Sequence, residues 1–144
     1  MKPPEIAAIL VNYNAGGELA RALRSIADEM VGRSWEAFVI DNASSDGSGA
    51  SVANFAPMVQ LVQNTANVGF SRGVNQGLAA STAPLVLIMN PDCRLVAGAV
   101  ATLRGVLGAH ADCAIVGPRI LNPDGSVQGS ARGETPTDFD LLSC

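Results

Sequence analysis

Two short apolar runs in this sequence each lead into an acidic side chain. Residues 38–40 (Phe-Val-Ile) are followed by Asp41, and residues 85–89 (Leu-Val-Leu-Ile-Met) are followed by residues 90–92 (Asn-Pro-Asp). Runs of this length and composition are typical of buried strands. If the strands are parallel neighbours, both acids emerge at the edge where open α/β sheets bind ligands. Acids at such an edge suit a metal ion and the base or ribose of a nucleotide, and they do not suit a bare phosphate.

Each acid also has a structural interpretation, because Asp is a favoured residue at helix N-caps. Asp41 could brace the serine-rich loop at residues 44–49, and Asp92 could cap a helix that begins near Val96. The functional alternative for Asp41 is a hydrogen bond from a nucleobase N–H, with Asn42 beside it able to donate and accept. The functional alternative for Asp92 is a cation such as Mg²⁺, which combines one or two carboxylates with phosphate oxygens.

A glycine-spaced segment covers residues 67–77, in which Gly69, Gly73 and Gly77 recur every four residues. Glycines let the backbone approach a ligand closely, and a helix N-terminus offers N–H donors to phosphate. The same glycines could simply serve the packing of a helix on a sheet. The segment is not a P-loop, because no Gly-Lys-Ser/Thr follows, and a dinucleotide fingerprint would come after the first strand. Arg72 is either a diphosphate contact or a solvated residue on a helix face.

Strands and helices are predicted to alternate along the chain. Strands are predicted at residues 6–11, 37–40, 59–62, 85–89 and 114–116. Helical spacing predicts four helices between them, marked by Leu19, Leu23, Ile26 and Met30; by a short helix ending at Phe55; by Phe70, Val74 and Leu78; and by Val96, Val100, Leu103 and Leu107. Such alternation indicates an α/β domain with a mostly parallel sheet flanked by helices.

The C-terminal part of the sequence differs from this pattern. Residues 122–125 (Asn-Pro-Asp-Gly) are a turn sequence and predict a β-hairpin near the C-terminus. Because this copy of Asn-Pro-Asp is explained by its turn, the tripeptide carries a functional meaning only where it follows an apolar strand. We therefore expect one domain over residues 1–132 and an irregular tail at residues 133–144.

Composition limits the function classes. The formal net charge is −4 over 144 residues, whereas nucleic-acid-binding surfaces are basic, so no nucleic-acid partner is expected. An acidic protein that binds an anionic nucleotide needs a local cation, which favours a divalent metal. Three scattered cysteines without a CxxC pair predict no disulfide framework and no zinc site, and they suggest a cytoplasmic protein. No signal peptide or membrane-spanning run is expected. The single histidine, His110, is predicted at a helix end, which excludes a Ser-His-Asp hydrolase.

Four motifs, in this order, resemble the family 2 glycosyltransferases with the GT-A fold. They are residues 11–14 (Val-Asn-Tyr-Asn), 41–48 (Asp-Asn-Ala-Ser-Ser-Asp-Gly-Ser), the glycine-spaced segment at 67–77 and residues 90–92. The rhamnosyltransferase-like and galactofuranosyltransferase-like branch is also suggested by residues 117–120 and the turn at 124–125. The resemblance covers about residues 5 to 132, and it suggests a C-terminally truncated chain that holds the donor-binding half.

The resemblance implies transfer of a sugar, with inversion, from a nucleotide diphosphate to an acceptor hydroxyl. It implies a donor site formed by Asn12, Tyr13, Asn14, Asp41, Asn42, Gly69, Arg72, Asn75 and Asn90. Asp92 matches the last acid of the family's metal motif, whereas Asn90 stands in place of the first acid. Weak binding of Mg²⁺ or Mn²⁺ that depends on the donor diphosphate is therefore expected, with the ion acting as a Lewis acid on the leaving group.

The expected partners are a UDP- or dTDP-linked sugar and a glycan or lipid-linked acceptor, with peripheral membrane association in the full-length protein and a role in bacterial polysaccharide biosynthesis. A homodimer is expected because truncation would uncover apolar surface near residues 114–116 and the hairpin. The general base that inverting transfer needs is expected outside this chain, since none of the later acids matches the family's motif: Asp124, Glu134, Asp138 and Asp140. Transfer by this chain should then be slow or absent.

Two alternatives remain open. The chain could be a catalytically silent remnant that binds nucleotide or self-associates. A nucleotidyltransferase of similar fold is a more distant alternative, because it would want a glycine-rich loop bearing Arg or Lys after the first strand, where this sequence has Asn12, Tyr13 and Asn14.

Overall fold

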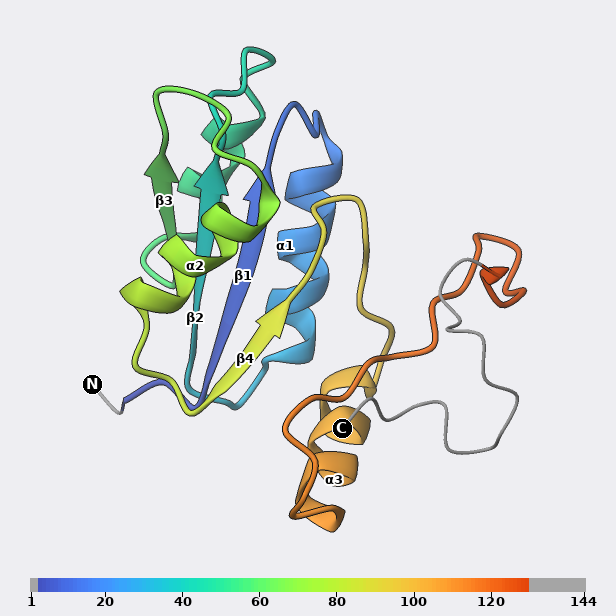
Figure 1. The fold of residues 1–144 in the computed structure, drawn as a ribbon. Coiled ribbons are helices and arrows are strands. Elements are labelled where there is room, and N and C mark those ends of the chain that lie inside the picture. The colour runs from blue at the N-terminus through green and yellow to red at the C-terminus, as the bar shows by residue number, and fades with distance from the viewer. Residues whose placement is uncertain (1–2, 130–144) are drawn as a thin grey trace. The chain divides into compact units, whose positions relative to one another are not determined.

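The computed structural model describes residues 3–129, which form two units that divide between Val96 and Ala97 (Figure 1). The first unit contains, in chain order, β1 (Ile6–Asn12), α1 (Glu18–Glu29), β2 (Trp35–Asp41), the 3₁₀ helix η1 (Ser48–Phe55), β3 (Val59–Gln63), α2 (Phe70–Ala80) and β4 (Leu85–Ile88). The second unit contains α3 (Ala99–Ala109). The predicted boundary at residue 132 and the tail at residues 133–144 lie outside the described residues.

The first unit is built on a four-stranded sheet in the order β3-β2-β1-β4, and every neighbouring pair is parallel. This confirms the predicted α/β architecture with a parallel sheet. All seven residues of β1 are buried, because it has a strand on either side and a helix over each face. Figure 1 shows α2 in front of the strands and α1 behind them. η1 contacts α1 as well as β2 and β3.

The face of α1 that packs on the sheet is the predicted one. Leu19, Leu23 and Ile26 have no exposed surface, and Met30, which follows the helix, is 1% exposed. Their spacing of three to four residues places them on one stripe of the helix, so that the charged residues between them face solvent.

The buried face of α2 differs from the prediction. Phe70 is 51% exposed and Leu78 is 41% exposed, while the buried residues are Gly73, Val74 and Gly77. A Cβ atom at Gly77 would lie 2.6 Å from Ile9 Cγ2. The packing interpretation of Gly73 and Gly77 is therefore correct: they let α2 lie directly on the sheet, which turns the larger residues outward.

The second unit departs most from the sequence prediction. α3 begins at Ala99 after Gly98, so Val96 precedes the helix and is 63% exposed. His110 follows the last helical residue, as predicted. The strand predicted at residues 114–116 does not form in the described chain; a run of three residues has too few backbone hydrogen bonds to hold itself without a partner strand. The hairpin is reduced to one antiparallel bridge between Leu121 and Val127.

Replacing Gly77 by Ala should destabilise the first unit by about 1–3 kcal/mol, because the added methyl group overpacks against Ile9. Denaturant unfolding measures this change. Gly105 in α3 is the matched control, since a Cβ there meets no atom within 4 Å; Gly105→Ala should be neutral or stabilise by up to about 1 kcal/mol through helix propensity. Equal stability of the two variants would contradict the close packing of α2.

Candidate functional site

Three strands end together at the carboxyl edge of the sheet. Asn12 of β1 is paired with Asp41 of β2, and Asp41 is paired with Gln63 of β3. On the other side of β1, the last residue of β4, Ile88, is paired with Ile9. The loops that follow all four strands therefore lie at one edge, as predicted for Asp41 and Asp92, although β2 and β4 are not the neighbours that the prediction assumed, because β1 lies between them. With strands about 4.8 Å apart, β2 and β4 are separated by roughly 10 Å across β1.

Asp41 is locked into the protein at this edge. Its side chain is 3% exposed. Oδ1 accepts hydrogen bonds from Asn12 Nδ2 (2.6 Å) and Ser44 Oγ (2.6 Å), and Oδ2 accepts one from the backbone N–H of Ser44 (3.1 Å). The contacts of Asp41 in this structure are therefore those expected if it braces the serine-rich loop at residues 44–49. These bonds also hold Ala43 at φ +61, a conformation that a non-glycine residue rarely adopts.

Asn12 is the centre of this polar cluster. It is fully buried, and its Nδ2 donates to Asp41 Oδ1 and to the hydroxyl groups of Ser44 (3.0 Å) and Ser48 (2.8 Å). Its Oδ1 is the one buried side-chain oxygen or nitrogen without a hydrogen-bond partner among residues 3–129. Buried acceptors are normally satisfied by protein or water, so this atom indicates a missing partner at the sheet edge.

A second set of bonds joins the loops after β1 and β2. Asn14 Oδ1 accepts from the backbone N–H of Ser45 (2.8 Å). Asp46 accepts from the backbone N–H of Gly16 (2.7 Å) and, through its other oxygen, from the hydroxyl (2.6 Å) and N–H (2.9 Å) of Ser48. The Ser48 hydroxyl is the largest cause that lowers the pKa of Asp46, followed by the Ser48 N–H. Ser44 and Ser48 were not among the site residues predicted from the sequence, although each follows an aspartate closely, Asp41 by three residues and Asp46 by two, which was a usable signal.

Amide side chains connect the ends of β2 and β3 to α2. Asn42 accepts from Asn64 Nδ2 (2.9 Å), and Asn64 and Gln76 exchange two hydrogen bonds of 2.9 and 2.8 Å. Asn42 Nδ2 also donates to Asn67 Oδ1 (3.2 Å) and to the carbonyl of Gly69 (3.4 Å). Gly69 has φ +86 and precedes the first residue of α2. The network therefore holds the N-terminus of α2 at the sheet edge, and nothing in the sequence pointed to Gln76.

Asp92 occupies a tight turn, which we call the Asp92 turn (residues 90–93). It is closed by a hydrogen bond from the Cys93 N–H to the Asn90 carbonyl (3.1 Å), with Pro at the position that suits such turns. Asp92 is exposed, and its Oδ1 accepts a weak hydrogen bond from Cys93 Sγ at 3.8 Å. The capping interpretation of Asp92 is wrong, because the residue that precedes α3 is Gly98.

The second copy of the tripeptide provides an internal comparison. Residues 122–125 form the same turn, with the Gly125 N–H donating to the Asn122 carbonyl (2.9 Å). There, however, the Asp124 carboxylate accepts from both the hydroxyl (2.6 Å) and the N–H (2.9 Å) of Ser126. The two copies share the hydrogen bond that closes the turn, but in the Asp92 turn the carboxylate is left available to a ligand.

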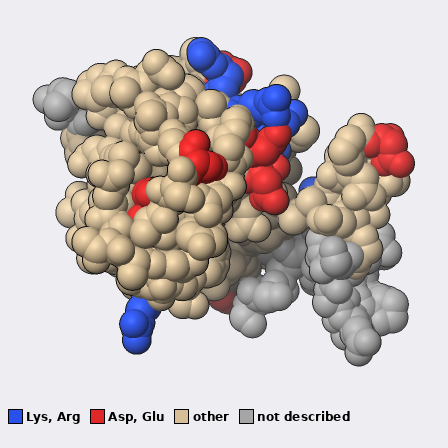
Figure 2. Space-filling view, turned by 90° about the horizontal axis from the view of Figure 1, so that it is seen from above, with Lys and Arg blue, Asp and Glu red and all other residues tan. Residues whose placement is uncertain are grey.

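The remaining predicted residues lie at or near the edge with their side chains exposed. Tyr13 is 55% exposed, and Arg72, Asn75 and Asn90 are also exposed. Figure 2 looks onto this edge, where acidic and basic side chains are both visible on a largely uncharged surface. Within residues 3–129, no cluster of three or more His, Cys, Asp or Glu side chains could hold a metal ion by itself. A cation at Asp92 would therefore need oxygens from a ligand.

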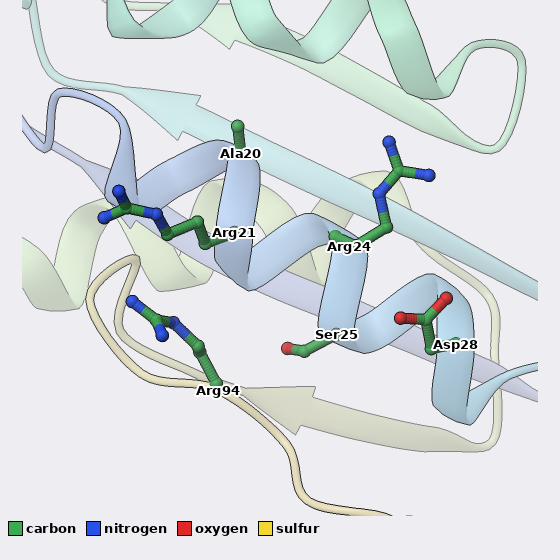
Figure 3. Close-up of a pocket in the computed structure, with 6 residues that line it drawn as sticks. All are labelled: Ala20, Arg21, Arg24, Ser25, Asp28 and Arg94. Carbon is green, nitrogen blue, oxygen red and sulfur yellow. The ribbon is translucent and has the colours of Figure 1, made fainter. Parts of the chain in front are cut away.

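A shallow depression beside α1 adjoins the segment after β4 (Figure 3). It is lined by Ala20, Arg21, Arg24, Ser25, Asp28 and Arg94. Glu18 bridges two of the arginines, with Arg94 Nη2 2.9 Å from Oε2 and Arg21 on Oε1. The hydrogen bond from Arg94 is the largest cause that lowers the pKa of Glu18. Glu18 and Asp28 thus offset two of the three arginines, and the depression has little net charge.

Replacing Ser48 by Ala should raise the pKa of Asp46 toward its ordinary value of 3.8. Because the folded-state pKa is depressed, the contribution of Asp46 to stability is present above pH 3.8 and is lost as the pH falls through the lower, folded-state value. NMR titration of the Asp46 carboxyl in the wild-type and Ser48→Ala proteins tests this. A carboxyl that titrates at the same pH in both proteins would show that the Ser48 hydroxyl does not govern it.

No helix among the described residues is long and apolar enough to cross a membrane. The chain resembles solved structures, of which two illustrate the similarity. The mannosyltransferase PcManGT from Pyrobaculum calidifontis, solved with GDP-Man and Mn²⁺, aligns with a TM-score of 0.70 and 24% identity over 86% of this chain and 37% of that one. Residues 1–349 of Staphylococcus aureus TarS, solved with UDP, align with a TM-score of 0.65 and 18% identity over 74% and 33% of the two chains. These similarities confirm the predicted GT-A fold.

Curated sequences extend the comparison. N-acetylglucosaminyl-diphospho-decaprenol L-rhamnosyltransferase of Mycobacterium tuberculosis is 30% identical over 135 residues, which cover 86% of this chain and 44% of that protein. An uncharacterized protein of the same species is 35% identical over 101 residues, covering 69% and 31%. The chain thus spans less than half the length of these relatives. Residues 7–139 match the sequence family described as Glycosyl transferase family 2. With this match over most of its length, the chain belongs to glycosyl transferase family 2.

Proposed function

We propose that this chain binds the donor of an inverting glycosyltransferase, a nucleotide-diphosphate sugar with a divalent cation, at the carboxyl edge of its sheet. The observation that carries the proposal is the contrast between two acids at the ends of the strands that flank β1, Asp41 as the last residue of β2 and Asp92 in the turn after β4. Asp41 is buried with its oxygens occupied, whereas Asp92 is exposed with its carboxylate available. Asp41 therefore suits a fixed recognition surface, and Asp92 suits the role of a cation ligand.

We place the nucleobase beside the ends of β1 and β2. The unpartnered Oδ1 of Asn12 can accept a hydrogen bond once an N–H group or a water reaches it. Tyr13 presents an exposed ring at the same strand end, and aromatic rings stack on bases of any identity. Asn14, Asp41 and Asn42 then act mainly by holding the loops that frame the base, since most of their polar atoms are used within the protein.

We place the diphosphate and its cation at the Asp92 turn. The donor set fits Mg²⁺ or Mn²⁺ weakly, because a single carboxylate with ligand phosphate oxygens is a common way to hold Mg²⁺. When bound, the ion would stabilise negative charge on the leaving diphosphate. Asn90 offers an amide oxygen in the same turn, and Arg72 and Asn75 on α2 are exposed for contact with the anionic donor. The uncapped start of α2 after Gly69 adds N–H donors at this edge.

The choice of substrates rests on the relatives. One relative is named as a rhamnosyltransferase that acts on a diphospho-decaprenol acceptor, and two neighbours were solved with GDP-Man and UDP. We propose a UDP- or dTDP-linked donor and a glycan or lipid-linked acceptor, in a cytoplasmic enzyme of polysaccharide biosynthesis. Peripheral membrane association and a homodimer of the whole protein belong to the same proposal. Of the acids in the tail, Glu134, Asp138 and Asp140 lie outside the described residues, and the general base is proposed to lie outside this chain.

Nucleotide binding should depend on Mn²⁺ or Mg²⁺, and Asp92→Ala should remove that dependence by deleting the exposed carboxylate of the Asp92 turn. Calorimetry with UDP- and dTDP-sugars, in the presence of Mn²⁺ or of a chelator, measures both effects. In the wild-type protein the metal should strengthen binding by at least about tenfold, which corresponds to 1.4 kcal/mol. Equal affinity with metal and with chelator would contradict the proposed site.

Asp124→Ala is the matched control for this experiment. It removes the same residue from the same turn, but from the copy whose carboxylate is already bonded to Ser126. Asp124→Ala should therefore keep the metal dependence of the wild-type protein. Metal-dependent donor binding without sugar transfer would favour the alternative in which this chain is a catalytically silent nucleotide-binding protein.

A further inference from the structure

We propose that Ser25, Arg94 and Glu18 are positioning residues that hold the Asp92 turn against α1 and thereby determine where the cation binds. The inference rests on the proposed role of Asp92 as the metal ligand. None of the three residues belongs to the donor site that the sequence motifs indicated.

The Asp92 turn is attached to the rest of the first unit at both ends. Before it, the Met89 N–H donates to the Ile9 carbonyl of β1 (3.1 Å). After it, the Leu95 N–H donates to Ser25 Oγ of α1 (3.1 Å). The turn therefore bridges from the sheet to the helix, and the Ser25 contact is its anchor on the helical side.

The Ser25 hydroxyl is oriented for this contact. It donates its own proton to the Ala22 carbonyl one turn earlier in α1 (2.8 Å), so that a lone pair is left for the Leu95 N–H. Ser25 is half-buried and its neighbours on α1 are packed on the sheet. Its acceptor atom is therefore fixed by the helix, and the backbone at Leu95, three residues after Asp92, is fixed with it.

Arg94 supplies a second contact between the same segment and α1. Its Nη2 lies 2.9 Å from Oε2 of Glu18, the first residue of the helix. Figure 3 shows Arg94 reaching from the segment after β4 toward α1, on the same side as Arg21. The two side chains of the pair are 56% and 36% exposed, so salt screens this contact and we rank it below the Ser25 hydrogen bond.

The position of Asp92 matters more here than in a site with two acids. Because residue 90 is Asn, the Asp92 turn offers the cation one carboxylate, and no second acid in residues 90–93 compensates if that carboxylate moves. Groups behind a metal ligand that hold it in place commonly change metal affinity by about 10–100-fold when they are removed. Ser25 and Arg94 act in this way through the backbone of the turn rather than through a bond to the Asp92 carboxylate.

Ser25→Ala should weaken the Mn²⁺ affinity of the nucleotide-bound protein by about tenfold and should leave nucleotide affinity in chelator unchanged. Mn²⁺ titration followed by calorimetry measures the first quantity, with UDP as the nucleotide probe. Amide hydrogen exchange at Leu95, measured without metal or nucleotide, should become faster. Ser25→Thr keeps the hydroxyl and should restore both properties, and Arg94→Ala should have a smaller effect in the same direction. Arg21→Ala is the control, since Arg21 pairs with the other carboxylate oxygen of Glu18, Oε1.

Wild-type Mn²⁺ affinity in Ser25→Ala, or equal loss in Ser25→Ala and Ser25→Thr, would overturn the inference. A loss of nucleotide affinity in chelator would also overturn it, because general damage to the unit would then explain the result. If Asp92→Ala abolishes metal dependence while Ser25→Ala does not, the proposed function stands and the positioning role fails. If Asp92→Ala keeps metal dependence, the metal site itself fails and the positioning role fails with it.

Discussion

The hydrogen bond between Asn12 Nδ2 and Asp41 Oδ1 is the contact around which the carboxyl edge of this sheet is organised. A carboxylate that is 3% exposed is costly unless donors surround it, and Asn12 and Ser44 supply three of them. A hydrogen bond to a charged group contributes about 1.5–3 kcal/mol. The loops after β1 and β2 must therefore take the one arrangement in which these donors converge.

This constraint divides the edge into two parts with different properties. On the side of β2 and β3, polar side chains are bonded to one another, and the loops have little freedom to rearrange. On the side of β4, Asp92 keeps its carboxylate available at the tip of a turn. A nucleotide that spans both parts would meet a preformed surface for its base and, beside its diphosphate, a carboxylate that is available to a cation. Preformed contacts reduce the entropic cost of binding, which is why the first part suits recognition.

Close packing of α2 completes the arrangement. Because Gly73 and Gly77 lack side chains, the helix lies directly against Val11 and Ile9 of β1, and its N-terminus comes to the same edge as Asn12. Asn42 then joins the end of β2 to the Gly69 carbonyl. Gly73 and Gly77, within α2, thus serve packing, whereas Gly69, before the helix, serves the conformation of the loop. The two interpretations of these glycines therefore apply to different positions.

Much of this arrangement could be predicted from local patterns. The apolar runs located the four strands, the spacing of Leu19, Leu23 and Ile26 predicted the buried face of α1, and the acids that end two strands were placed at the ligand edge. Such features depend on residues close in the sequence, so the spacing of apolar and polar residues predicts them directly. Predictions that needed a distant partner were less successful, as the unformed strand at residues 114–116 shows.

By itself, then, the sequence determined the parallel α/β sheet and the presence of Asp41 and Asp92 at its carboxyl edge, because strand ends and turn residues are local properties. Only the tertiary structure decided that Asp41 is locked and Asp92 is not. The bonding of the Asp41 carboxylate depends on a contact between residues 29 positions apart, Asn12 and Asp41. The anchoring of the Asp92 turn depends on a contact between residues 70 positions apart, Ser25 and Leu95. No short-range sequence pattern predicts such pairs, because their residues come together only when α1 packs on the sheet and the strands pair.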